Sequence, residues 1–317
     1  MQFQIKKIEM NSPIIVVHQG VAEYLKLCLL KARQYNPSTP IVLIGDEENI
    51  CLVDLIPDLT HVIPDHTNDD ILTLKNNYKH RNTQTEAWKT FELMCLMRWF
   101  FVRDFMKQNK IERCLHIDSD VLLFCDVWQA GEPFQKYGMT LAPWGDTYNL
   151  MGHTCYINDL QLLDRYCNLI QDYYSDPEKS RFLDETMYAK FLRREKGARF
   201  EVSDMTFLKI LHDENPQLFG NVSDIVNGST FDNRLTSCIG GWATNTRLIK
   251  DEMKKIIFEN KIPYCWNKAL QKKVRFHSVH FHGPMKYMIK YFFQEKVNYY
   301  GDILIERAKI KLRKLFQ

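Results

Sequence analysis

The sequence predicts an α/β protein in which helices flank a mixed, mostly parallel sheet. In the first third of the 317-residue chain, short β-branched runs alternate with helical patterns. This alternation is typical of parallel strands joined by right-handed crossover helices. Hydrophobic residues make up 45% of the chain, which is enough for a large core and argues against global disorder. We therefore expect a sheet whose ligands gather beyond the carboxyl ends of its strands.

The first 65 residues contain three predicted strands and one predicted helix. The strands are the apolar runs 14–17, 41–44 and 61–63. Residues 21–35 have leucines and an alanine at helical spacing, and Asn36-Pro37 ends the pattern. No G-x-G-x-x-G motif follows the first strand, so we do not expect a dinucleotide site.

A polar stretch and a long helix come next. Residues 65–85 are polar and should form a loop with a short helical piece, suited to act as a flap. Residues 86–107 carry apolar side chains over a wide face, which is typical of a helix packed on a sheet. Arg98 interrupts this helix between Met97 and Trp99. The residue pattern alone is compatible with a surface arginine whose aliphatic stem packs on apolar neighbours.

Two carboxylates follow the next apolar run. Cys114 to Ile117 lead to Asp118-Ser119-Asp120, and a second apolar run covers 121–124. Two acids side by side repel each other unless a cation lies between them. Oxygen ligands suit Mg²⁺ or Mn²⁺, and either ion can carry a phosphate-bearing ligand. A D-x-D triplet alone is weak evidence, because about one occurs by chance in a chain of this length.

The middle of the chain continues the α/β pattern. Residues 139–143 should form a strand, and the segment 149–158 places small residues before another one. Residues 160–174 have helical spacing, and Ser203 or Asp204 can cap a further helix.

Residues 221–259 carry polar signals of two kinds. The stretch 221–245 is rich in turn dipeptides such as Asn227-Gly228 and Asp232-Asn233, and predicts short strands and loops. The stretch 250–259 is charged and contains a lysine run, which predicts a helix or loop with a solvated face.

Three histidines fall within six positions near the end of the chain, at 277, 280 and 282. His280, Gly283 and Lys286 form H-x-x-G-x-x-K. Neutral imidazole is a common metal ligand, a glycine lets the backbone approach a phosphate, and a lysine can meet a diphosphate as a mobile charge. His280 and His282 share a face if this segment is a strand, so the pattern leaves open which of them would bind a metal.

The D-x-D triplet and the late H-x-x-G-x-x-K motif together resemble the nucleotide-sugar glycosyltransferases of the GT-A fold, most of all family 8. The resemblance implies a GT-A-like (Rossmann-like) catalytic domain over 1–295. Its nucleotide-sugar half would span about 1–127 and its acceptor half about 128–295. It also implies Mn²⁺ or Mg²⁺ as cofactor, held by Asp118, Asp120 and His280.

The resemblance further implies which residues contact the substrates. Donor-binding residues would come from the ends of the first strands, the long helix and the two motifs, namely His18, Gln19, Gly20, Asp46, Arg98, Asp118, Ser119, Gly283 and Lys286. Catalytic candidates are Asp204, which would face the donor sugar or an acceptor hydroxyl, together with Lys286 and His153. Gly152 and His153 would line the sugar pocket. A helix cap for Asp204 and a buried structural role for His153 remain open alternatives.

The implied reaction is metal-dependent transfer of a hexose from a nucleotide sugar, a UDP-hexose, to a hydroxyl of a glycan or lipid-linked acceptor, with retention of configuration. Two other classes stay open. One is a metal-dependent hydrolase of a phosphate ester or nucleotide sugar, and the other is a non-catalytic nucleotide-sugar-binding module.

Charge and cysteine content bear on location and partners. The net charge of +3 gives no case for a nucleic-acid partner. Nine scattered cysteines without a C-x-x-C pair predict reduced thiols in a cytoplasmic setting. The sequence has no apolar run long enough to predict a signal peptide or a membrane span. The segment 296–317 should form a basic amphipathic helix. It would either dock on the domain or contact an anionic membrane surface, which would suit a peripheral enzyme with a lipid-linked acceptor.

Overall fold

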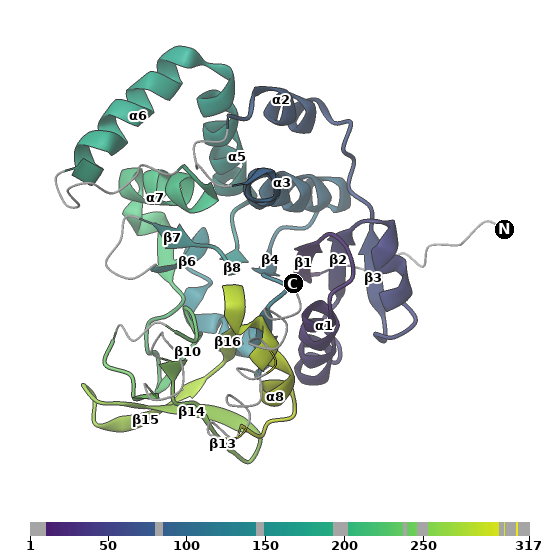
Figure 1. The fold of residues 1–317 in the computed structure, drawn as a ribbon, viewed down its shortest axis with the longest axis vertical. Helices are drawn as coiled ribbons and strands as arrows, with labels where there is room; N and C mark the ends of the chain where they lie inside the picture. The colour runs from purple at the N-terminus through teal and green to yellow at the C-terminus, as the bar shows by residue number, and fades with distance from the viewer. Residues whose placement is uncertain are drawn as a thin grey trace.

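The structure is a computed structural model that describes residues 11–79, 85–143, 149–192, 202–236, 240–245, 253–297, 301 and 309. It confirms the predicted fold class. A mixed, mostly parallel sheet lies between helices on its two faces, and smaller sheets lie beside it (Figure 1).

Among the described residues, the central sheet has eight strands. Their order is β3 (Leu59–Val62), β2 (Ile41–Gly45), β1 (Ile14–His18), β4 (Cys114–Ile117), β8 (Thr154–Ile157), β6 (Met139–Pro143) and β7 (Leu150–Met151), with β9 (Phe219–Asn221) also paired to β6. The strands from β3 to β4 run parallel, whereas β8 runs antiparallel to β4 and β6. The carboxyl ends of β1, β2 and β4 therefore share one edge, which is where a ligand of such a sheet binds.

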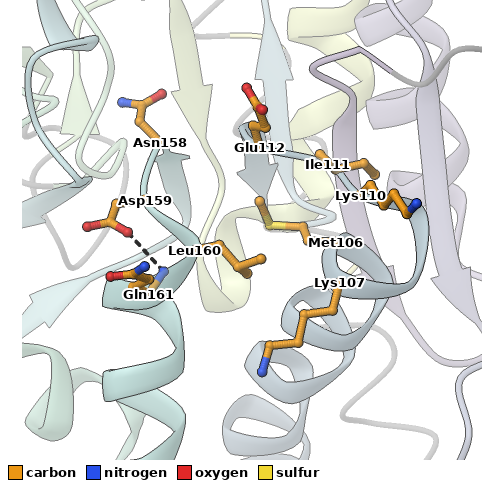
Figure 2. Close-up of a pocket in the computed structure, with 9 residues that line it drawn as sticks. All are labelled: Met106, Lys107, Lys110, Ile111, Glu112, Asn158, Asp159, Leu160 and Gln161. Carbon is orange, nitrogen blue, oxygen red and sulfur yellow. Dashed lines mark hydrogen bonds between the residues drawn. The ribbon is translucent and has the colours of Figure 1, made fainter.

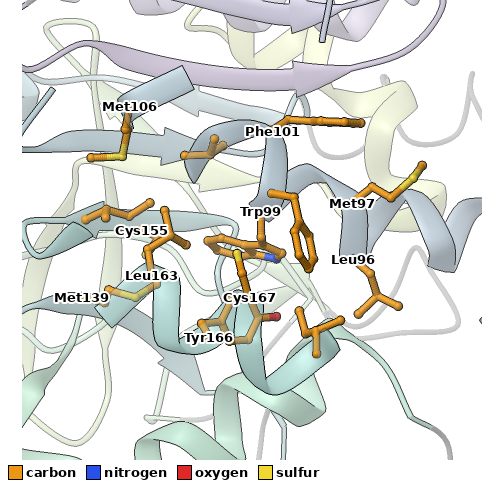
Figure 3. Close-up of a cluster of buried hydrophobic side chains, with 14 of the residues drawn as sticks. Leu96, Met97, Trp99, Phe101, Met106, Met139, Cys155, Leu163, Tyr166 and Cys167 are labelled. Atoms are coloured by element: carbon orange, nitrogen blue, oxygen red, sulfur yellow. The ribbon is translucent and has the colours of Figure 1, made fainter. Parts of the chain in front are cut away.

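Helices cover both faces of this sheet because successive β1 residues point to opposite sides. Ile14 and Val16 pack in the layer of α1 (Glu23–Tyr35), and Ile15 packs in the opposite layer. That opposite layer contains α2 (Asp69–Asn77), α3 (Glu86–Asn109), α5 (Leu160–Ser175), α6 (Pro177–Leu192) and α7 (Asp204–Glu214). At its centre Trp99 of α3 lies edge-on to Tyr166 of α5, with ring centroids 5.3 Å apart (Figure 3). The sequence pattern predicted the other long helices, but it gave no signal for α6.

The C-terminal third forms smaller sheets around a third apolar cluster, next to α1 (Figure 1). One sheet has the order β10 (Ser229–Thr230), β15 (Lys272–Phe276), β14 (Ile262–Asn267) and β13 (Ile257–Glu259). Two further pairs are β11 (Thr244–Asn245) with β12 (Met253–Lys254), and β5 (Val121–Leu123) with β16 (Ser278–His280). The short helices are α4 (Val127–Ala130), α8 (Ile289–Phe293), and the 3₁₀ turns η1 (Glu47–Leu52), η2 (Glu132–Phe134), η3 (Pro216–Leu218) and η4 (Gly283–Met288).

One sequence prediction is wrong. The stretch 250–259 was expected to be a solvated helix or loop, but its described part forms β12 and β13, and Lys254 is fully buried. The lysine can be buried because three oxygen atoms accept hydrogen bonds from its ammonium group.

Two other predictions fall partly outside the described residues. Of the basic helix predicted over 296–317, the structure describes only residues 296, 297, 301 and 309. Of the polar stretch 65–85, residues 80–84 lie outside the description, and α2 is its short helical piece. Within the described part of the chain, none of the helices combines the length and apolar character that crossing a bilayer would require.

Candidate functional site

A short antiparallel ladder joins the D-x-D triplet to the distant histidines. The strand β5 starts directly after Asp120, and β16 pairs with it in a register that places His280 opposite Val121. The ladder continues with Phe281, whose N–H donates to the Asp120 carbonyl at 2.9 Å. As a result one potential ligand atom from each of Asp118, Asp120 and His280 lies within 4.8 Å of the others.

The imidazole of His280 presents a lone pair to this cluster. Its Nδ1 lies 2.9 Å from the Asn233 carbonyl, which can only accept, so Nδ1 carries the proton and Nε2 does not. Nε2 lies 3.5 Å from Oδ1 of Asp120. That oxygen is buried and receives no hydrogen bond. Two electron pairs thus face each other with no proton donor between them, which is the arrangement that a cation satisfies.

The two aspartates have different surroundings. Oδ1 of Asp118 lies 2.6 Å from Nη1 of Arg98, and Nη2 of the same guanidinium lies 2.6 Å from Oδ2 of Asp204. Oδ2 of Asp120 lies 3.3 Å from Nζ of Lys286. Arg98 is therefore no surface residue, because its side chain is only 15% exposed and it bridges two acids.

These surroundings move the pKa values in opposite directions. Burial raises the pKa of Asp118, but the Arg98 guanidinium, together with the His116 and His280 rings, outweighs burial and holds that pKa well below its usual range. Burial raises the pKa of Asp120 to about 6, with Lys286 opposing the shift and Asp118 adding to it. Burial also lowers the pKa of His280 to about 4, so the ring is neutral at pH 7.

The H-x-x-G-x-x-K motif runs from His280 at the end of β16 into η4, which begins at Gly283 and contains Lys286. Gly283 has φ = +52°, and a Cβ at this position would meet no atom within 4 Å, so the backbone there is open to a ligand. The ammonium of Lys286 lies over the ring of Tyr24, 4.6 Å from its centroid. Partial burial of Lys286 acts to lower its pKa, but negative groups around it, Asp120 foremost, raise that pKa above its ordinary value.

The predicted donor residues on β1 and β2 form a second part of the same edge. Gly20, at φ = +75°, donates its N–H to Oδ2 of Asp46 at 2.7 Å, which ties the two strand ends together. Oδ1 of Asp46 is buried without a hydrogen-bond partner. His18 ends β1, and its pKa is lowered to about 4 by burial and then by Lys286, so this edge lies near the motif lysine. Gln19 is exposed beside it.

Asp204 is the first residue of α7, and Ser203 is the N-cap residue. The Asp204 carboxylate accepts from Arg98 and, at 3.3 Å, from Nε1 of Trp99. Its carbonyl accepts from the hydroxyl of Tyr166 at 2.8 Å. This packing links α3, α5 and α7 behind Asp118.

His153 and Gly152 lie behind the metal-ligand candidates. The ring of His153 is stacked on that of His280, with centroids 4.1 Å apart, and its Nε2 donates to the Asp232 carbonyl at 2.8 Å. Its exposed fraction is 1%, and burial lowers its pKa to about 3. A Cβ at Gly152 would lie 2.4 Å from the Trp99 ring. Packing and hydrogen bonding thus account for a histidine at 153 and a glycine at 152. A direct contact of either residue with a sugar stays a prediction.

Sequence reasoning missed Asp232 and Asn233 as part of the site. The pair gave only a turn signal, yet Asn233 accepts from the His280 ring and Oδ2 of Asp232 accepts from the His280 N–H at 3.1 Å. No local pattern links residues 232–233 to residue 280, so only the fold reveals these contacts. Ser119, which separates the two acids in the sequence, is buried.

A separate cleft of about 510 Å³ lies at the opposite edge of the sheet, between the end of α3 and the start of α5 (Figure 2). Its lining includes Ile111 and Glu112, which precede β4, and Asn158, which follows the antiparallel β8. Asp118 lies at the other end of β4, so this cleft is not part of the site described above.

Comparison with known proteins found partial structural matches but no family match. No protein-family model and no curated protein matches the chain. Among solved structures, mouse xyloside xylosyltransferase 1 is 12% identical, with a TM-score of 0.49 over 69% of this chain and 87% of that one. The glycosyltransferase GlyE of Streptococcus pneumoniae TIGR4 is 14% identical (TM-score 0.38), and the match covers 68% of this chain and only 46% of that longer one. The galactosyltransferase LgtC, solved with donor and acceptor sugar analogues, is 9% identical (TM-score 0.36), with 63% and 70% covered.

Proposed function

We propose that the protein is a metal-dependent glycosyltransferase that moves a hexose from a nucleotide sugar, UDP-linked, to a hydroxyl of a glycan or lipid-linked acceptor. The observation that carries this proposal is the bare Nε2 of His280 facing an unpartnered carboxylate oxygen of Asp120 at 3.5 Å. Asp118 completes a set of three ligands, and Lys286 lies beside it where a diphosphate would need a cation.

A divalent cation such as Mn²⁺ or Mg²⁺ fits this donor set. Ligand atoms about 2.1 Å from an octahedral ion lie about 3 Å apart when adjacent and about 4.2 Å apart when opposite. The three candidate atoms lie within 4.8 Å of one another, so a small inward movement of the side chains would bring them into range. Carboxylate oxygen with one imidazole is a donor set that Mn²⁺ accepts. When bound, the ion would supply Lewis-acid stabilisation of the negative charge on the departing diphosphate.

The other residues of the site would position the donor. Lys286 would bind the diphosphate as a mobile charge, and the open backbone at Gly283 would let a phosphate approach. The unpartnered Oδ1 of Asp46 would accept a hydrogen bond from a donor hydroxyl group. Arg98 holds Asp118 ionised and, with Asp204, forms the wall behind it. By its resemblance to family 8, the transfer would retain the anomeric configuration.

A panel of nucleotide sugars would test the proposal. Thermal shift and calorimetry would compare UDP-hexoses and GDP-hexoses with Mn²⁺ and with EDTA. We expect a UDP-hexose to stabilise the protein only when Mn²⁺ is present. Equal UDP affinity with and without Mn²⁺ would overturn the proposed site.

Product analysis would separate the three classes. Sugar transferred to an added hydroxyl acceptor supports the transferase. Full turnover to free hexose, unaffected by any acceptor, would identify a hydrolase, and metal-dependent binding without turnover would identify a binding module. His280→Ala should abolish Mn²⁺ binding, and His282→Ala, two residues away, is the matched control that should retain it.

A further inference from the structure

A buried lysine lies behind the metal-ligand candidates, in a stretch that the sequence predicted to be solvated. Lys254 of β12 has no exposed surface, and its Nζ has three oxygen partners. These are Oδ1 of Asp232 at 2.5 Å, Oδ1 of Asn233 at 2.7 Å and the Arg234 carbonyl at 2.8 Å. An ammonium group has three N–H bonds, so one lysine ties three consecutive residues together.

The segment 232–235 in turn surrounds His280. Oδ2 of Asp232 accepts from the His280 N–H, and the Asn233 carbonyl accepts from Nδ1 of its ring. The His280 carbonyl accepts from the N–H of Leu235 at 2.9 Å. The Asp232 carbonyl also holds the ring of His153, which is stacked on His280. The backbone of His280, the Nδ1 edge of its ring and the ring face that His153 covers therefore depend on where this segment lies.

We propose that Lys254 is a positioning residue for His280: by holding residues 232–234 it fixes the carbonyl that aims Nε2 of the imidazole at Asp118 and Asp120. The inference rests on the proposed metal-dependent function. It assigns Lys254 no contact with substrate or metal. Groups that orient metal-binding histidines in this way are worth about 10- to 100-fold in metal affinity.

Replacing Lys254 with methionine tests the proposal, because two explanations predict opposite signs. Lys254→Met removes a positive charge near the site, and electrostatics alone would make a cation bind more tightly. Loss of positioning would make it bind more weakly. We expect Mn²⁺ affinity, measured from the electron paramagnetic resonance signal of free Mn²⁺, to fall about 10- to 100-fold. The visible absorption spectrum of bound Co²⁺ should also change, because it reports ligand geometry.

Lys31→Met is the matched control. Lys31 is another buried lysine, 1% exposed, whose Nζ lies 2.9 Å from a carboxylate oxygen of Glu295, where α1 meets the residues after α8. Both variants remove a buried ammonium from an acidic partner, so both should lower the midpoint of thermal unfolding. Only Lys254→Met should weaken Mn²⁺ binding. Unchanged or tighter Mn²⁺ binding by Lys254→Met, or equal weakening by both variants, would overturn the proposal.

The design also covers a variant that fails to fold. The double variant Lys254→Met/Asp232→Asn removes both charges, so no unpaired carboxylate stays buried. It should fold and still bind Mn²⁺ about 10- to 100-fold more weakly than the wild type. Wild-type affinity in a folded double variant would overturn the positioning role. Absence of Mn²⁺ binding by the wild-type protein would instead overturn the proposed function itself.

Discussion

The same substitution at the two aspartates of the D-x-D triplet should change stability in opposite directions. Burial raises the pKa of Asp120 from 3.8 to about 6. The folded chain therefore binds a proton on the Asp120 carboxyl more tightly than the unfolded chain does. The stabilisation that this protonation gives the fold is lost as the pH rises from about 4 to 6. At pH 7 a shift of about two units corresponds to about 3 kcal/mol of destabilisation by the ionised group. Asp120→Asn removes that charge, and its amide can donate to the bare Nε2 of His280.

Asp118→Asn should have the reverse effect. Burial raises the pKa of Asp118, but Arg98, at 2.6 Å, and the neighbouring His116 and His280 together outweigh burial, so this pKa lies below its ordinary value. An ionised Asp118 thus stabilises the fold at pH 7, and its loss leaves Arg98 with one of its two acidic partners. We expect Asp118→Asn to cost about 2–4 kcal/mol, whereas Asp120→Asn should add about 1–3 kcal/mol.

Urea unfolding of the metal-free proteins at pH 7.5, followed by circular dichroism, measures both changes. In thermal scans each kcal/mol corresponds to about 2 °C in Tm for a chain of this size. Neither variant should show the Mn²⁺-dependent rise in Tm expected of the wild type. The gain from Asp120→Asn should vanish near pH 4, where the wild-type carboxyl is protonated. Equal destabilisation by both substitutions, or a preserved Mn²⁺ effect in Asp120→Asn, would refute the reasoning.

Three further predictions follow from the site. The Mn²⁺ affinity of the wild type should fall as the pH decreases below about 6, because Asp120 must lose its proton to bind the ion. Calorimetric titrations with Mn²⁺ from pH 5 to 8 would check this. An affinity that does not change with pH would contradict it. Lys286→Gln should shift the pH dependence of Mn²⁺ affinity to higher pH, because Lys286 lowers the pKa of Asp120. The same variant should weaken UDP binding about tenfold. An unchanged UDP affinity would show that Lys286 does not bind the diphosphate. Gly152→Ala should lower the free energy of unfolding, measured in urea, by about 1–3 kcal/mol, because the new Cβ would lie 2.4 Å from the buried Trp99 ring. An unchanged free energy of unfolding would show that the ring can move at little cost.

The sequence by itself determined the class of fold and the chemistry of the two motifs. Apolar runs with β-branched residues marked β1, β2 and β6, and helical spacing marked α1, α3 and α5, because side-chain periodicity is a local property. It also identified Asp118, Asp120 and His280 as residues of metal-binding type. It missed α6, which begins with Pro177 directly after α5, and it left His280 and His282 equivalent.

Only the tertiary structure decided how those residues meet. The pairing of β5 with β16 brings residues 120 and 280 together across 160 positions of the chain, and that register depends on packing far from either motif. The tertiary structure also decided which aspartate of the D-x-D triplet is ion-paired with Arg98. It decided as well that Lys254, which is part of a charged run in the sequence, is buried. A charged side chain is exposed unless distant atoms supply its partners, and the sequence does not contain the distances to the three oxygens that Lys254 meets.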